Sequence, residues 1–144
     1  MPDTPTRSAF QRLAALFRRN GGDEGLGSAV SAQRAIELVR EGAAMLDVRE
    51  RSEWNTGHAP QALHVPLGDI AKAPGRLKQD RPVVVVCASG MRSRTAAKHL
   101  RDQGFEAASI SGGMAAWRNA GGSVHDLVDV HAASVPGDLA AARA

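Results

Sequence analysis

The sequence predicts a single α/β domain built around a mostly parallel sheet. Segments with strand character alternate with segments of helical periodicity, and the connections between them are short. The clearest strand, residues 83–87, begins with four consecutive valines. Such a run, with no polar alternation, is typical of a strand covered on both faces, as in a parallel sheet. A chain of 144 residues has room for one such domain and for terminal segments outside it.

The first half of the predicted domain contains a helix, two strands and a weak helical segment. The helix is expected to start after Ser31, whose hydroxyl suits an N-cap, and to end at Gly42. Its apolar residues at helical spacing are Ala35, Ile36 and Val39. The strands and the weak helical segment after them are expected at 43–48, 62–67 and 69–72.

The second half repeats the alternation of strand and helix. Strand 83–87 is followed by a helical pattern from Ser93 to Gln103, which Gly104 ends. Residues 106–110 read as another buried strand. A short helix framed by glycines is expected within 112–122. We therefore place the folded domain at residues 28–122.

The two ends of the chain have a different character. Residues 1–27 combine a short basic amphipathic helix with a glycine-rich linker. Such a helix can lie on an anionic membrane surface, dock on a partner, or pack on its own domain. Residues 123–144 form an alanine-rich tail that we expect to be partly disordered.

Composition limits the classes of partner and compartment. A net charge of +3 without a basic run, and only two Trp and three Phe, argue against a nucleic-acid partner. The chain has no apolar stretch long enough for a transmembrane helix and no secretory signal pattern. A single cysteine excludes an internal disulfide and indicates a reducing compartment, the cytoplasm. The histidines show no metal-ligand spacing, so we expect no metal or other cofactor.

The lone cysteine, Cys87, ends the best strand and precedes a short loop that contains Gly90. In a parallel α/β sheet, ligand chemistry gathers at the carboxyl ends of the strands. A short glycine-bearing loop before a helix can turn its N–H groups inward, and these groups, the helix N-terminus and Arg92 all favour a thiolate. The pattern predicts a reactive cysteine. The alternative, a small buried hydrophobic residue, is the commoner fate of a free cysteine in general.

Three motifs in the same order resemble the rhodanese family of sulfurtransferases, over about residues 28–122. They are "LDVRERSEW" with "TGHAPQALHVPL" (46–67), "CASGMRS" (87–93) and "SGGMAAW" (111–117). The resemblance implies a small, mostly parallel central sheet flanked by helices on both faces. It also implies an enzyme of the thiosulfate sulfurtransferase type, without metal or organic cofactor, whose partners are a small anionic sulfur donor and a thiol or protein acceptor.

The resemblance assigns the chemistry to Cys87, which would carry sulfane sulfur as a persulfide. The loop that binds the substrate would comprise Ala88, Ser89, Gly90, Met91, Arg92 and Ser93. Within it, Arg92 would orient an anionic donor, and Ser93 would cap the following helix and donate to the sulfur. Asp47 and Arg49 are expected to brace the cysteine loop through hydrogen bonds, and Glu53 and His58 to belong to a polar network that holds the loop after strand 43–48.

Two other functions remain open at this point. A persulfide carrier or regulatory binding module would use the same domain and recognise a protein partner. Cysteine-dependent phosphatases and arsenate reductases also hold a thiolate in a loop closed by arginine. The enzymes of this kind that are similar have five residues between the cysteine and the arginine. Here four residues separate Cys87 from Arg92, which favours a single sulfur over a tetrahedral phosphate. The sequence does not identify the physiological donor, the acceptor or the oligomeric state.

Overall fold

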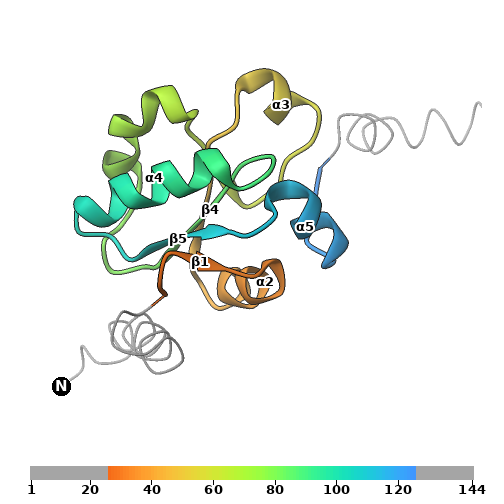
Figure 1. Cartoon of the computed structure of the whole chain (residues 1–144), viewed down its shortest axis with the longest axis horizontal. Coiled ribbons are helices and arrows are strands. Elements are labelled where there is room, and N and C mark those ends of the chain that lie inside the picture. The colour runs from red at the N-terminus through yellow and green to blue at the C-terminus, as the bar shows by residue number, and fades with distance from the viewer. Residues whose placement is uncertain (1–25, 126–144) are drawn as a thin grey trace, which may run out of the picture.

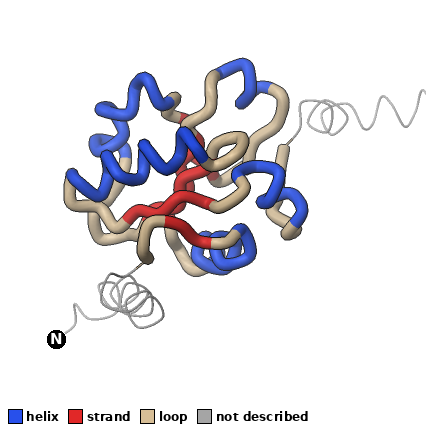
Figure 2. Tube along the Cα trace, in the orientation of Figure 1, coloured by secondary structure: helices blue, strands red, loops and turns tan. Residues whose placement is uncertain are grey.

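Five parallel strands form the central sheet (Figures 1 and 2), in the order β1-β5-β4-β2-β3. The computed structural model of the protein describes residues 26–125. The strands are β1 (Ala29–Val30), β2 (Ala44–Asp47), β3 (Ala62–His64), β4 (Val83–Val86) and β5 (Ala107–Ile110). Because they all run the same way, their carboxyl ends meet at one edge of the sheet. The predicted α/β class with a parallel sheet is confirmed.

Helices cover both faces of this sheet, as predicted. The helices are α2 (Ala32–Arg40), α3 (Arg51–Asn55), the 3₁₀ helix η2 (Leu67–Arg76), α4 (Met91–Asp102) and α5 (Gly113–Asn119), of which α3 has no buried residue. Buried residues of α2 and α5 pack in one core, and those of α4 and η2 pack in a second core. The ribbon shows the two layers on opposite sides of the strands (Figure 1).

The valine strand supplies both cores. Val84 and Val86 face the core shared with α2 and α5, whereas Val83 and Val85 face the core shared with α4 and η2. All four side chains are completely buried. Burying a valine contributes about 1.5–3 kcal/mol relative to leaving it exposed, so β4 is the main hydrophobic anchor of the sheet. Trp117 of α5 fills the first core, and its indole N–H donates to the Ser123 carbonyl (2.9 Å).

The observed elements differ from the predictions in several details. β1 was not expected, because two residues carry no readable periodicity; it exists through pairing with β5. In α2 the fully buried face is Ala32, Ala35 and Leu38, while Ile36 and Val39 are only partly buried. η2 continues through Pro74 instead of stopping before it. The predicted cap of α2 is confirmed, since the Ser31 hydroxyl accepts from the Arg34 N–H (3.1 Å).

The start of α4 corrects the prediction for Ser93. This helix begins at Met91, and its N-cap is Gly90, which has a left-handed φ of 110°. Glycine tolerates this conformation, so the chain turns directly from the loop into the helix. Ser93 therefore lies in the first turn and does not cap it.

Parts of both chain ends lie outside the described residues. The basic amphipathic helix predicted within 1–27 and most of the tail predicted at 123–144 belong to these parts. Of the tail, His125 forms an antiparallel bridge with His58. Within residues 26–125, no helix has the length and apolar character needed to cross a membrane.

Replacing Gly113 with alanine should strongly destabilise the fold. Its φ is 61°, and a Cβ there would meet the carbonyl oxygens of Cys87 and Ala88. We expect Gly113→Ala to lower the free energy of unfolding by at least about 2 kcal/mol in denaturant titrations. The matched control is Gly75→Ala, where a Cβ meets nothing within 4 Å, and a change of less than about 0.5 kcal/mol is expected. Equal stabilities of the two variants would contradict the close packing of α5 on the loop after β4.

Candidate active site

Cys87 follows β4 directly, at the carboxyl edge of the sheet, and its loop leads into α4. The loop is also fixed from the side of α5, because the Met114 N–H donates to the Cys87 carbonyl (2.9 Å). Ala88 and Ser89 are exposed, whereas Cys87 and Gly90 are buried. Met91 is 71% exposed, the most exposed large apolar side chain in residues 26–125. The sulfur therefore lies beneath a short loop whose outer residues face solvent.

The Cys87 sulfur is surrounded by hydrogen-bond donors from its own loop. The Gly90 N–H donates to Sγ at 3.0 Å and the Ser93 N–H at 3.3 Å. The Ser93 hydroxyl oxygen lies 3.5 Å from Sγ. These donors belong to the start of α4, where unpaired N–H groups give the helix its partial positive charge. The arrangement suits an anion on sulfur.

Two opposing effects determine the pKa of the Cys87 thiol. Burial raises it, since the side chain has no exposed surface. Hydrogen bonds from the Ser93 side chain and from the N–H groups of Ser93, Gly90 and Ser89 lower it. The hydrogen bonds prevail, and the pKa of Cys87 lies below its ordinary value. A residue that packs as an apolar core side chain is thus kept closer to ionisation than a free thiol.

Arg92 is paired with Glu53 of α3. Its Nη1 and Nη2 donate to the two carboxylate oxygens at 2.7 and 2.9 Å. The Arg92 hydrogen bond is the main reason that the pKa of Glu53 falls to about 2, and the same bond raises the pKa of Arg92. The pair uses two of the five guanidinium N–H groups, so the others can still donate to an anion. Arg92 and Glu53, both predicted from sequence, are therefore joined to each other.

Asp47 and Arg49 form a buried pair after β2. Arg49 donates to both carboxylate oxygens of Asp47, with the shortest distance 2.8 Å, and also to the Gly57 carbonyl (2.7 Å). We expected these side chains to brace the cysteine loop. In the described part of the chain their hydrogen bonds instead hold the segment that follows β2, because each charge finds its partner two residues away.

His58 belongs to an aromatic stack in the same segment. Trp54 stacks on His58, with ring centroids 3.5 Å apart, and on His64, with centroids 4.5 Å apart. His58 Nδ1 donates to the Trp54 carbonyl (2.8 Å), and His64 Nε2 donates to the Arg49 carbonyl (2.8 Å). These contacts give His58 a supporting place in the loop after β2. Among residues 26–125, no three His, Cys, Asp or Glu side chains are grouped to hold a metal ion.

Sequence analysis missed one polar residue beside the site. Ser109 on β5 is 1% exposed, and its hydroxyl oxygen lies 2.6 Å from that of Ser93. The sequence contains a signal for this residue, because Ser109 is the only polar residue of its strand. That strand, β5, pairs with β4, which Cys87 follows directly. A buried hydroxyl in that position requires a partner.

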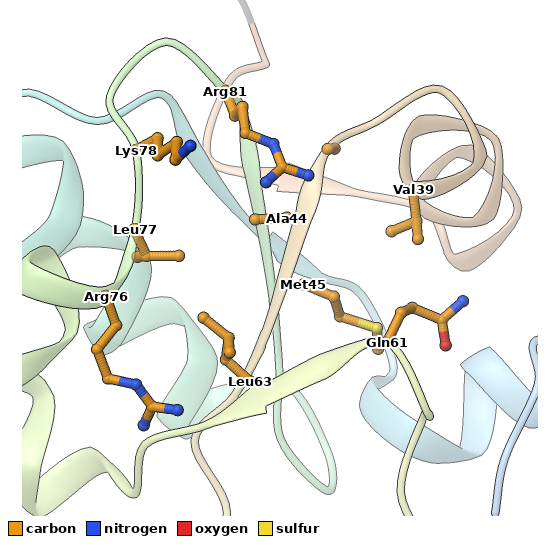
Figure 3. A pocket seen from close by; sticks show the side chains of 10 residues that line it. Val39, Ala44, Met45, Gln61, Leu63, Arg76, Leu77, Lys78 and Arg81 are labelled. Carbon is orange, nitrogen blue, oxygen red and sulfur yellow. The ribbon is translucent and has the colours of Figure 1, made fainter.

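A pocket of about 370 Å³ lies elsewhere on the sheet (Figure 3). It is lined by apolar side chains, including Met45 and Leu63, and by three cations, Arg76, Lys78 and Arg81. Ala43 and Ala44 place it at the start of β2, and Ala44 pairs with Val83, the first residue of β4. The pocket is therefore near the amino ends of the strands, away from the edge that carries Cys87.

Three comparisons agree with this geometry. The family model of the rhodanese-like domain matches residues 31–120. A putative sulfurtransferase from Bacillus subtilis, YtwF, is 44% identical over 73 residues, which cover 51% of this chain and 71% of that protein. The thiosulfate sulfurtransferase GlpE of Pseudomonas savastanoi pv. phaseolicola is 36% identical over 87 residues, covering 60% of this chain and 82% of that protein.

Solved structures show the same fold. The crystal structure of the Alr3790 protein from Anabaena superposes with a TM-score of 0.61 at 31% identity, covering 73% of this chain and 86% of that one. Since the family model spans more than half of the sequence and the sheet, helices and cysteine loop follow in the expected order, the chain belongs to the rhodanese-like domain family.

Proposed function

We propose that the protein is a sulfurtransferase that takes sulfane sulfur from an anionic donor such as thiosulfate and carries it as a persulfide on Cys87. The observation that supports this most directly is the pair of N–H groups, from Gly90 and Ser93, that donate to Sγ and would stabilise a sulfur anion. Names of relatives point to the same class, since one is a thiosulfate sulfurtransferase and another a putative sulfurtransferase.

The reaction has two exchange steps. In the first, the Cys87 thiolate attacks the sulfane sulfur of thiosulfate; an S–S bond forms, the bond to the sulfonate sulfur breaks, and sulfite leaves with the electron pair. In the second, a thiolate acceptor attacks the outer sulfur of the Cys87 persulfide, and the Cys87 thiolate leaves. Each step consumes one anion and releases one, so no proton or external oxidant is needed.

The loop serves both steps in the same way. A low thiol pKa makes Cys87 a ready nucleophile in the first step and a good leaving group in the second. The donors from Gly90 and Ser93 can hold the negative charge on either the thiolate or the persulfide. Because Cys87 has no exposed surface at rest, we propose that donors reach it past the exposed residues Ala88 and Ser89.

The first prediction concerns the persulfide itself. Incubation with thiosulfate should add one sulfur atom, about 32 Da by mass spectrometry, which Cys87→Ser abolishes and which cyanide removes. Because the chain has no other cysteine, the Ser variant is a complete control. An adduct that persists in Cys87→Ser, or efficient hydrolysis of an aryl phosphate without any adduct, would contradict the proposal.

The second prediction concerns pH. Protonation removes the reactive form of sulfur, so the alkylation rate with iodoacetamide falls as the pH drops through the pKa of the thiol. Because the folded protein lowers that pKa, the inflection should lie below the value of a free cysteine, about 8.5, and return to it in denaturant. The inflection is the readout, since enclosure by the loop slows the absolute rate. A folded protein that is unreactive at every pH, or whose Cys87 titrates as a free thiol, would refute the proposal that the fold favours the Cys87 thiolate.

The third prediction concerns Arg92. Arg92→Ala removes a cation and leaves the Glu53 carboxylate uncompensated, which disfavours a dianionic donor. We expect the KM for thiosulfate to rise about tenfold, with a smaller change in kcat. The control is Arg94→Ala, which removes the same charge from an exposed position of α4, and for which a change below about twofold is expected. Equal effects of the two variants would show that only general charge matters.

A further inference from the structure

Ser109 is an unusual residue for its position. It is buried in β5, two residues after Ala107, which packs in the core with α4, and the other residues of β5 are apolar. Burying a hydroxyl costs free energy unless it is hydrogen-bonded. Its partners are the Ser93 hydroxyl at 2.6 Å and, at the limit of a hydrogen bond, the Gly90 carbonyl at 3.5 Å. Both partners belong to the loop that encloses the Cys87 sulfur.

The Ser93 hydroxyl has one hydrogen and three possible acceptors. It can donate to the Gly90 carbonyl at 3.1 Å, to the Cys87 sulfur at 3.5 Å or, because either hydroxyl can be the donor, to the Ser109 oxygen at 2.6 Å. When Cys87 is a thiol, its S–H can donate to the Ser93 oxygen, and the Ser93 hydrogen then goes to Gly90. When Cys87 is a thiolate, the sulfur only accepts, so the Ser93 hydrogen is needed there. The direction of this hydrogen bond is thus coupled to the ionisation of sulfur.

We infer that Ser109 is a positioning residue that donates its hydrogen to Ser93 and thereby directs the Ser93 hydroxyl toward the sulfur anion. In the chain Ser109 to Ser93 to Cys87, each hydroxyl accepts from the residue before it and donates to the next, and such chains strengthen their members. The inference rests on the proposed function, for which it names the residue that supports the loop from β5.

The Gly90 carbonyl can release the Ser93 hydrogen at little cost. It also accepts the Arg94 N–H (3.3 Å) in the first turn of α4, so it retains a partner when Ser93 turns away. An alanine would fill the same place in the strand, as Ala107 does two residues earlier. Packing alone therefore does not require a hydroxyl at position 109.

The charges at this edge do not replace the hydroxyl chain. β2 ends in Asp47, which is paired with Arg49, and α4 contributes Arg92, which is paired with Glu53. The two strands next to the site, β4 and β5, contain no ionisable side chain. With these charges paired, hydroxyl and backbone donors are the main direct support for the sulfur anion.

The test is the pH profile of Cys87 alkylation by iodoacetamide in the full-length protein. Ser109→Ala should move the inflection to higher pH and lower the rate at pH 7 about threefold. The control is Ser111→Ala, an exposed hydroxyl just after β5, which should leave the profile unchanged. Ser109→Thr keeps the hydroxyl and should retain the wild-type inflection. An unchanged profile in Ser109→Ala would overturn the inference.

A double variant separates positioning from a merely structural effect. If Ser109 acts through Ser93, then Ser109→Ala should have no further effect on the profile in a Ser93→Ala background. An equal effect in both backgrounds would overturn the inference, because it would mean that the hydroxyl acts on the fold and not on Ser93. Thermal unfolding of each variant, measured in parallel, identifies any loss of stability.

The alkylation readout is independent of sulfur transfer. A protein that forms no persulfide from thiosulfate, yet shows the expected profiles, would refute the proposed function and keep the role of Ser109. A protein that forms the persulfide normally but has the same pH profile with and without the Ser109 hydroxyl would refute the role of Ser109 and keep the proposed function.

Discussion

One constraint organises this molecule: the Cys87 sulfur is fully buried, yet it is surrounded by hydrogen-bond donors that favour its ionised form. Burial alone would keep Cys87 protonated and inert. The loop reverses that preference with N–H donors from Gly90 and Ser93, and these donors point inward only because Gly90 adopts a left-handed conformation at the start of α4. The loop is anchored at one end by β4 and at the other by α4, and α5 holds it from the side through the Met114 N–H.

The ionic pairs around the loop support the segments that enclose the sulfur. Asp47 with Arg49, and Glu53 with Arg92, each bring opposite charges to within 2.8 Å or less. Paired in this way, they add little net charge near the sulfur while they fix the segment after β2 and the first turn of α4.

The sequence was informative where a signal is local. The valines of β4, the Ser31 cap and the placement of Cys87 after a buried strand follow from neighbouring residues, and each is found in the structure. The partner of Arg92 is 39 residues away, and only the pairing of β2 with β4 brings α3 beside the loop. Ser109 is visible in the sequence as the one polar residue of a buried strand, but its partner Ser93 is 16 residues away in the first turn of α4. The start of α4 was misplaced because a glycine with positive φ replaced the expected serine cap.

The contact between α5 and the cysteine loop has a consequence for the order in which the protein matures. A chain is synthesised from its amino end, and Cys87 emerges well before Gly113 and Met114, which close on its carbonyl group. Until those residues have left the ribosome, the Cys87 carbonyl lacks its Met114 partner, so the loop is not yet fixed from the side of α5. The cysteine loop therefore reaches its final form late in synthesis, when the domain is nearly complete.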